Sequence, residues 1–348
     1  MKLLIITQKV DKNDSVLGFF HRWIEEFSKH CESVLVICLE KGEYNFPAHV
    51  QVISLGKEKH VFRLKYVLNF YYTIWKERKN YTAVFVHMNP EYVLLGGWIW
   101  RLLRKKIGLW YVHKQVNAKL RIAEKFVHFL FTVTNKSFQL KTKKIIFVGH
   151  GIDTLYFTPR NETSKNEKFT ITSVGRITRI KKLEDLINSV EYFSDEMKKN
   201  MRVQFIGSPI SEEDKTYEHE LKELVEKKKN GIPLQFMGAV PFDSMRDVYW
   251  SADVCVNLAP TGGIDKTVLE SFSCGVPTLF RNQAFLAVLG ENVEKYFFQN
   301  EQALYEKIKA LYENKIPFSK NKFHEMIRQS HDVRMLIPKI IQAYRLKK

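Results

Sequence analysis

One short segment, residues 262–280 (GGIDKTVLESFSCGVPTLF), combines residue types that bind an anion with residue types that bind hydroxyl groups. Gly262 and Gly263 allow a ligand to approach the backbone closely, and Asp265 is the predicted N-cap of the helix that follows. The first N–H groups of a helix are unpaired and carry the positive end of its dipole, which favours a phosphate. Glu270 lies on the first turns, and its carboxylate can accept two hydroxyl hydrogen bonds. The segment predicts a site for a phosphate and a sugar diol, although a capped helix with an ordinary surface glutamate explains the same pattern.

A second segment, residues 169–190 (FTITSVGRITRIKKLEDLINSV), places two cations in one turn between a strand and a helix. Its apolar run ends at Gly175, Arg176 and Lys181 follow, and apolar residues then recur at helical spacing. Open α/β sheets bind ligands at the carboxyl ends of their strands, where a guanidinium and an ammonium group suit a diphosphate. The alternative is a solvated basic turn, which describes Lys182 better than Arg176, because Arg176 directly follows the strand glycine.

In their order along the chain, these segments resemble the family-4 glycosyltransferases of GT-B fold. Residues 149–159 (GHGIDTLYFTP) are similar to the interdomain stretch of that family, with His150 in place of its usual asparagine. The apolar runs near Gly207, Gly238 and Asp253 are similar to successive strand ends of its nucleotide-binding domain.

The resemblance implies an α/β fold with two Rossmann-like, doubly wound domains that face each other across a cleft. Residues 1–160 would bind the acceptor, residues 161–332 would bind the nucleotide-sugar, and residues 333–348 would form a terminal helix that returns to the N-terminal domain. Strand-like runs that alternate with amphipathic runs independently predict parallel sheets, and the polar stretch 160–168 is the predicted linker. The predicted strands are residues 2–7, 33–39, 50–55, 83–88, 107–113, 129–134 and 144–148, then 169–174, 202–206, 234–237, 254–258, 277–280 and 296–298.

The same resemblance implies transfer of a sugar from a nucleotide-diphosphate-sugar to an acceptor, with retention of the anomeric configuration. Arg176 and Lys181 match the pair that binds the diphosphate, and Glu270 matches the glutamate that holds the ribose. The nucleotide-sugar is a substrate, so no cofactor is expected. The acceptor implied is a lipid-linked molecule or a precursor of a cell-envelope glycan.

This chain departs from the family pattern at the donor sugar. The family commonly carries a second glutamate eight residues before the first, and Gly262 stands at that position here. The predicted donor-binding set therefore adds the glycine-rich stretch, with Gly262, Gly263, Ile264 and Asp265 covering the sugar. Two other functions remain open: a nucleotide-sugar epimerase of the same architecture, and a non-catalytic nucleotide-binding protein, which the missing glutamate favours.

In the first half of the chain, His113 ends the run IGLWYVH and matches a histidine that lies near the donor sugar in related enzymes. Together with Arg176 and Lys181 it forms the predicted catalytic set, unless it only caps a strand. Weaker candidates lie on the acceptor side, where the family usually has paired glycines after the first strand and this chain has one. They are Lys12, Asp14, Gly18 and His87, the last of which also fits a supporting or structural role.

Patterns for metal ligands and for a serine nucleophile are missing from the sequence, which contains no DxD-type motif, no Cys/His cluster and no serine-elbow pattern. We therefore expect metal-free transfer in which fixed positive groups stabilise the leaving diphosphate. The 4 cysteines lack metal spacing and lie in or beside apolar segments, so free, buried thiols in a reducing compartment are expected.

Positive charge is concentrated in residues 1–160, which hold 26 Lys and Arg against 12 Asp and Glu, compared with 29 against 26 in the rest. Within residues 98–125, cations lie close to Trp98, Trp100 and Trp110, a composition favoured at a lipid headgroup surface. The alternative is that the tryptophans fill the core and the lysines are solvated. Nucleic acid is a less suitable partner because no recognition motif is present. The apolar core of residues 1–7 is too short for a signal peptide and no apolar run approaches the length of a membrane span, so we expect a cytoplasmic protein, either free or peripheral on the inner face of the membrane.

Overall fold

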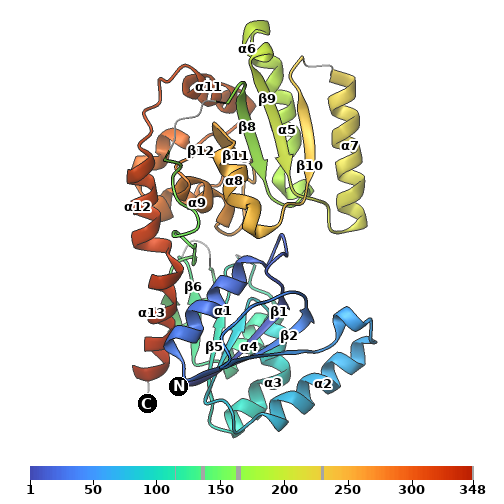
Figure 1. The fold of residues 1–348 in the computed structure, drawn as a ribbon, viewed down its shortest axis with the longest axis vertical. Coiled ribbons are helices and arrows are strands. Elements are labelled where there is room, and N and C mark those ends of the chain that lie inside the picture. The colour runs from blue at the N-terminus through green and yellow to red at the C-terminus, as the bar shows by residue number, and fades with distance from the viewer. Residues whose placement is uncertain (114, 135–137, 162–165, 229–230, 347–348) are drawn as a thin grey trace. The chain divides into compact units, whose positions relative to one another are not determined.

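The computed structural model describes residues 1–348 except 114, 135–137, 162–165, 229–230 and 347–348 (Figure 1). The chain forms two compact units. The first comprises Met1–Asp153, Pro241–Asp243 and Ser330–Lys348, and the second comprises Thr154–Val240 and Ser244–Gln329. The units divide after residues 153 and 329, whereas the expected divisions were after residues 160 and 332, and the assignment of residues 241–243 to the first unit was not expected. Part of the predicted linker 160–168 lies outside the described residues.

Among the described residues, the first unit is built on a 7-stranded parallel sheet of order β3-β2-β1-β4-β5-β6-β7. Its central strands are buried on both faces, which explains why they read as continuous apolar runs rather than as alternating patterns. The strands are β1 (Lys2–Val10), β2 (Ser33–Lys41), β3 (Val50–Ser54), β4 (Ala83–His87), β5 (Lys106–Trp110), β6 (Phe129–Thr132) and β7 (Ile145–Phe147).

The helices of the first unit form two groups. Helix α1 (Phe19–His30) packs against α13 (Val333–Leu346), whereas α2 (Arg63–Lys76), α3 (Pro90–Leu102) and α4 (Ala118–Phe126) contribute to one hydrophobic core with the sheet. The Tyr344 hydroxyl on α13 donates to the carbonyl of Val84 at 2.7 Å. The predicted return of the terminal helix to the N-terminal domain is therefore confirmed.

The second unit has a 5-stranded parallel sheet, in its described residues, of order β10-β9-β8-β11-β12. Both units are thus α/β folds with Rossmann-like parallel sheets, which confirms the predicted fold class. The strands are β8 (Phe169–Val174), β9 (Met201–Ile206), β10 (Leu234–Gly238), β11 (Val254–Asn257) and β12 (Thr278–Phe280). The helices are α5 (Leu183–Ser189), α6 (Asp195–Lys199), α7 (Glu212–Lys228), α8 (Met245–Trp250), α9 (Lys266–Ser273), α10 (Ala284–Leu289), α11 (Glu301–Tyr312) and α12 (Lys320–His331), which continues into the first unit.

One predicted strand, residues 296–298, is wrong. Tyr296 ends a short 3-10 helix, and Phe297 makes only an isolated bridge with Phe280. The run is apolar because Tyr296 and Phe298 are buried in the core of the unit, and burial alone does not require a strand ladder.

Candidate functional site

The two segments selected from the sequence meet at the topological switch point of the second unit. Strand β8 lies between β9 and β11, so the chain leaves β8 toward one side of the sheet and later returns on the other. In open α/β sheets, the carboxyl ends of the two strands at such a point border the ligand crevice. Arg176 and Lys181 follow β8, the glycine turn and α9 follow β11, and an ion pair between Lys181 and Asp265 joins the two segments.

The backbone behind this crevice is held tightly. Gly175 and Gly207, which follow β8 and β9, have φ values of 143° and 137°, a region that side chains disfavour. A Cβ on Gly207 would lie 2.0 Å from the carbonyl oxygen of Gly175. The N–H of Gly175 donates to Ile206 at 2.9 Å, and the N–H of Gly207 donates to Gly238 at 2.7 Å. The turn that carries Arg176 is therefore supported by the ends of the neighbouring strands.

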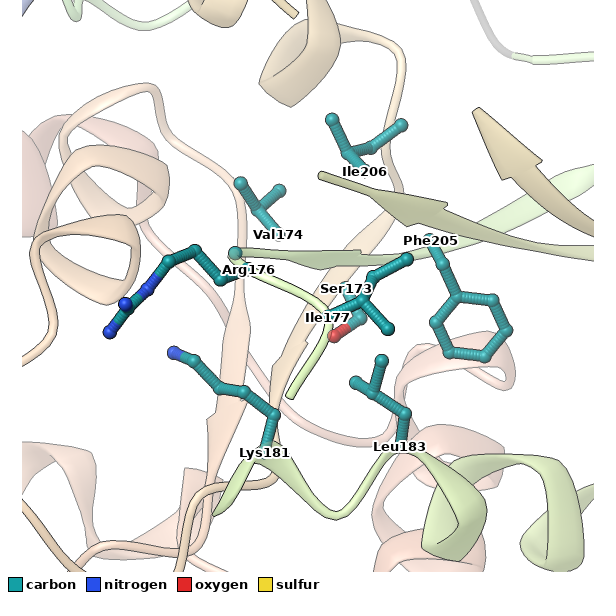
Figure 2. Close-up of a pocket in the computed structure, with 9 residues that line it drawn as sticks. Ser173, Val174, Arg176, Ile177, Lys181, Leu183, Phe205 and Ile206 are labelled. Atoms are coloured by element: carbon teal, nitrogen blue, oxygen red, sulfur yellow. The ribbon is translucent and has the colours of Figure 1, made fainter. Parts of the chain in front are cut away.

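The charged ends of Arg176 and Lys181 lie on the same side of this turn, as Figure 2 shows. They border a small pocket whose other walls include Ile177, Leu183 and Phe205. Arg176 is exposed and has no hydrogen bond or ion pair with any other described residue, whereas the Lys181 side chain is only 16% exposed. Arg176 is thus the cation in this turn that is available to an anion.

Lys181 is already neutralised by Asp265. The carboxylate of Asp265 also accepts a hydrogen bond from Asn257 Nδ2 at 3.0 Å and caps α9 through the N–H of Thr267. Burial raises the pKa of Asp265, but the Lys181 ammonium and these hydrogen bonds outweigh burial and hold that pKa below its usual value. The predicted N-cap is confirmed. The ion pair of Asp265 with Lys181 is an additional structural role, which was not predicted from the sequence.

Glu270 is buried, with 7% of its surface exposed. Its Oε2 accepts a hydrogen bond from the hydroxyl of Tyr249 at 2.8 Å, while Oε1 accepts none from the described residues. Burial raises the pKa of Glu270, although the charge of Lys266 and the Tyr249 hydrogen bond act in the opposite direction. Burial also lowers the pKa of Lys266. One carboxylate oxygen is therefore positioned by Tyr249, and the other remains available to a hydroxyl group.

The glycine turn before α9 leaves space for a ligand. Gly262 has a φ of 122°, and a Cβ there would meet no atom within 4 Å. Asn282 Nδ2 donates to the carbonyls of Gly262 and Gly263, each at 3.4 Å, and holds the turn. The side chain of Ile264 is buried in the core, so the predicted donor contact of this residue is restricted to its backbone.

Four residues of this site were not predicted from the sequence: Asn257, Tyr249, Lys266 and Asn282. Asn257 offered a usable signal, because it is a polar residue at the carboxyl end of an apolar strand. Tyr249 and Asn282 come from other elements, α8 and the turn after β12, and their positions depend on the tertiary fold.

In the first unit, the acceptor-side candidates belong to a loop supported by an ion-pair network. Lys9 Nζ lies 2.8 Å from Asp14 and 3.0 Å from Glu40. Asp14 also accepts the N–H groups of Val16 and Leu17 at 2.9 and 2.7 Å, so its carboxylate shapes the loop. Burial raises the pKa of Asp14, but Lys9 and these N–H groups lower it more.

Two other candidates are close to this loop. A Cβ on Gly18 would lie 2.5 Å from the carbonyl oxygen of Asp14 and 2.9 Å from that of Lys12, which explains the glycine by local crowding. Lys12 has a partly exposed ammonium group, 3.9 Å from Glu43, and remains the acceptor-side candidate with a side chain able to reach a ligand.

The two strand-end histidines differ. His87 is 1% exposed and its ring stacks on Phe20 and Trp110, with ring centroids 4.1 and 5.3 Å apart, so an acceptor contact is incompatible with its burial. The prediction that His87 contacts the acceptor is therefore wrong, and the alternative prediction of a structural role agrees with its burial. His113 is exposed beyond the carboxyl end of β5, which stops at Trp110 rather than at 113 as predicted.

The basic segment 98–125 is only partly a surface patch. Trp100 and Trp110 are buried in the core, while Trp98 is 53% exposed. The ammonium groups of Lys105 and Lys106 donate to the carbonyls of Tyr81 and Tyr344 at 2.6 and 2.5 Å, so they are structural contacts. Among the described residues of this segment, the exposed cations that remain are Arg101, Arg104, Lys119, Arg121 and Lys125.

The described residues form neither a metal-ligand cluster nor a helix suited to span a membrane. No three His, Cys, Asp or Glu side chains in the described ranges converge as metal ligands would. Within the same ranges, no helix combines the length and apolarity needed to cross a bilayer. The four cysteines are free. Cys38, Cys255 and Cys274 are buried as predicted, whereas Cys31 is partly exposed, and burial raises the pKa of Cys38 to about 12.

Solved structures with the same fold cover nearly the whole chain. HepE from Anabaena, in complex with UDP and glucose, matches with a TM-score of 0.79 and 13% identity over 100% of both chains. Sucrose-phosphate synthase from Thermosynechococcus elongatus matches with a TM-score of 0.75 and 14% identity over 99% of this chain and 98% of its own. WaaG, a glycosyltransferase involved in lipopolysaccharide biosynthesis, matches with a TM-score of 0.70 and 12% identity over 99% of this chain and 100% of its own.

Comparison at the sequence level identifies the family. No curated protein sequence matches the chain significantly. The profile of the glycosyl transferases group 1 family matches residues 157–331, which include the whole switch-point site described above. This chain belongs to the glycosyl transferases group 1 family and is a glycosyltransferase of GT-B fold.

Proposed function

We propose that the second unit binds a nucleotide-diphosphate-sugar and that the sugar passes, with retention, to an acceptor bound by the first unit, as in the family-4 enzymes that the sequence resembles. One observation carries this proposal: the same switch point presents the Arg176 guanidinium, which has no partner among the described residues, and the available Oε1 of Glu270. A guanidinium suits a diphosphate, and a carboxylate oxygen suits a ribose hydroxyl.

Catalysis in this site is electrostatic. Negative charge grows on the diphosphate as its bond to the sugar breaks, and Arg176 and the N–H groups at the start of α9 stabilise that charge more in the transition state than in the ground state. Lys181 contributes through Asp265, which it holds at the helix N-cap. His113, which is exposed in the first unit, is the residue that the resemblance assigns to a polar contact with the sugar.

The donor is a nucleoside-diphosphate sugar, for which UDP-glucose is the first probe because the similar HepE structure contains UDP and glucose. A panel of nucleotide-sugars, read by thermal shift, tests the assignment because tight binding raises apparent stability. Stabilisation followed by transfer to an added acceptor supports a transferase. Conversion of the sugar without acceptor indicates an epimerase, and binding without turnover indicates a non-catalytic protein.

The acceptor side is proposed to serve cell-envelope glycan synthesis, with a lipid-linked or glycan acceptor. WaaG, which shares the fold, is involved in lipopolysaccharide biosynthesis. The excess of cations in residues 1–160 suits an anionic membrane surface, and we place the protein in the cytoplasm, peripheral on the inner face of the membrane.

Replacing Glu270 by glutamine is expected to weaken nucleoside-diphosphate binding at least about tenfold, because a charge-assisted hydrogen bond contributes about 1.5 to 3 kcal/mol. Glutamine keeps an acceptor for the Tyr249 hydroxyl and so limits damage to the core. Calorimetric titration with UDP measures the loss. Glu220→Gln is the matched control, since Glu220 is exposed and pairs with Arg179. Equal affinity of the Glu270 variant and the wild type would exclude Glu270 as the ribose ligand.

Transfer is expected to continue in excess EDTA, because Arg176 and backbone N–H groups provide the positive charge that a divalent metal would otherwise supply. The initial rate is compared with and without EDTA, and then after addition of magnesium or manganese. Loss of turnover that either metal restores would show that the reaction requires a metal.

A further inference from the structure

A large cavity of the first unit lies outside the site described so far. It has a volume of about 420 Å³, within the range of ligand pockets, which is roughly 300 to 1,000 Å³. It is bounded by α2, by the first turns of α3 and by residues at or just beyond the carboxyl ends of β2 and β3. Its walls are Leu39, Leu55, Lys57, Arg63, Tyr66, Val67, Phe70, Tyr92 and Leu95.

The cavity combines an apolar interior with a cationic edge. Its lining contains Lys57 and Arg63 and no carboxylate. Lys57 pairs with Glu40 at 2.9 Å, whereas the exposed Arg63 makes no hydrogen bond or ion pair with the described residues. An apolar chain that ends in an anionic group satisfies both features, because the chain replaces water in the cavity and the anion pairs with Arg63.

The outer face of α2 is apolar and exposed. Leu64, Leu68, Tyr72 and Trp75 follow each other at helical spacing, and each is more than half exposed. Such contiguous apolar surface is uncommon on soluble proteins and marks an interaction site.

Cations flank this apolar stripe. Lys76 Nζ lies 5.7 Å from the ring of Tyr72, and the Arg78 guanidinium lies 4.6 Å from the ring of Trp75. Lys65 is exposed on the same helix. Glu77, the C-cap of α2, is buried and so adds little negative charge to this surface. Aromatic rings with cations beside them suit the headgroup layer of an anionic membrane, because its negative surface potential attracts basic residues.

We propose that this region is a lipid-binding site: the cavity receives a hydrocarbon chain of an anionic membrane lipid, Arg63 binds the lipid phosphate, and the outer face of α2 lies in the headgroup layer. The site is formed entirely by the first unit and does not depend on the proposed donor site. Binding of lipid can therefore be measured whether or not the protein binds a nucleotide.

Alkyl phosphates of increasing chain length test the cavity by calorimetry, below the concentration at which they form micelles. Affinity is expected to rise about fourfold for each added methylene, until the cavity is full. Val67→Trp, which fills the cavity, and Arg63→Gln should each weaken binding of decyl phosphate at least tenfold, while Lys65→Gln should not. Thermal unfolding of each variant confirms that it is folded. Affinity that is independent of chain length, or unchanged in Val67→Trp, would overturn the proposal.

Vesicles test the membrane source of the lipid. Binding is expected to phosphatidylglycerol-containing vesicles and to fall in pure phosphatidylcholine or in high salt, because salt screens exposed charges. Leu68→Glu should reduce vesicle binding at least tenfold, whereas Ile210→Glu, at an exposed apolar residue of the second unit, should not. Trp98→Glu tests the alternative patch on α3. Binding of alkyl phosphates without binding of anionic vesicles, or loss of vesicle binding only in Trp98→Glu, would show that α2 does not contact a membrane.

Discussion

Replacing Arg176 by alanine is expected to lower kcat about 100-fold or more, because removal of one preorganised donor from a developing anion typically has an effect of about 10²- to 10³-fold. Affinity for UDP-glucose should fall only about tenfold, since the bridging oxygen of the intact nucleotide-sugar carries less charge than it does in the transition state. Arg176 is exposed and unpartnered among the described residues, so the substitution breaks no internal contact. Steady-state kinetics and calorimetry separate the two effects.

The neighbouring Arg179 provides a matched control for this experiment. It lies in the same turn, but its guanidinium pairs with Glu220 and lies 5.2 Å from the ring of Tyr217. Arg179→Ala should leave kcat within about twofold, because surface pairs contribute little. If both variants lose activity equally, the general positive charge of the turn matters and Arg176 has no specific role.

Replacing Gly207 by alanine is expected to destabilise the second unit by about 3 kcal/mol or more. The new Cβ would lie 2.0 Å from the carbonyl oxygen of Gly175, and the φ of 137° is itself unfavourable for alanine. The backbone cannot move apart easily, because the N–H of Gly207 donates to Gly238 and that of Gly175 donates to Ile206. Urea unfolding followed by circular dichroism measures the change in the free energy of unfolding.

Gly238→Ala distinguishes crowding from backbone strain. Gly238 also has a positive φ, 75°, but a Cβ there would meet no atom within 4 Å. Its substitution should therefore destabilise by only about 1 to 2 kcal/mol, the effect of the left-handed conformation alone. Similar destabilisation in the two variants would show that the backbone shifts to relieve the contact with Gly175 and that this shift changes the free energy of unfolding only slightly.

Local signals in the sequence were sufficient to predict the elements that border the switch point. The strand before Gly175, the N-cap at Asp265 and the end of α9 before Gly275 depend on residues close together in the chain, and each was predicted close to its observed position. The pairing of Lys181 with Asp265 was not predicted, because the residues are 84 positions apart and only the order of β8 and β11 brings them together.

The errors concern apolar and aromatic residues whose neighbours are distant in sequence. His87 is a polar residue at a strand end, which is typical of a ligand contact, but Phe20 from α1 and Trp110 from β5 enclose it. Trp100 and Trp110 lie among cations in the sequence, yet their side chains face the core. Periodicity over a few residues could not separate these tryptophans from the exposed Trp98.

The position of α13 in the fold determines when the first unit can be completed during synthesis. Leu336, Ile337 and Ile340 are fully buried, and Tyr344 packs on Phe129 and Phe131 of the first sheet, although this helix is translated after every residue of the second unit. Domains usually fold in the order of their synthesis. Here the second unit emerges from the ribosome complete while one face of the first is still uncovered, so the domain that begins the chain is the last to acquire its full core.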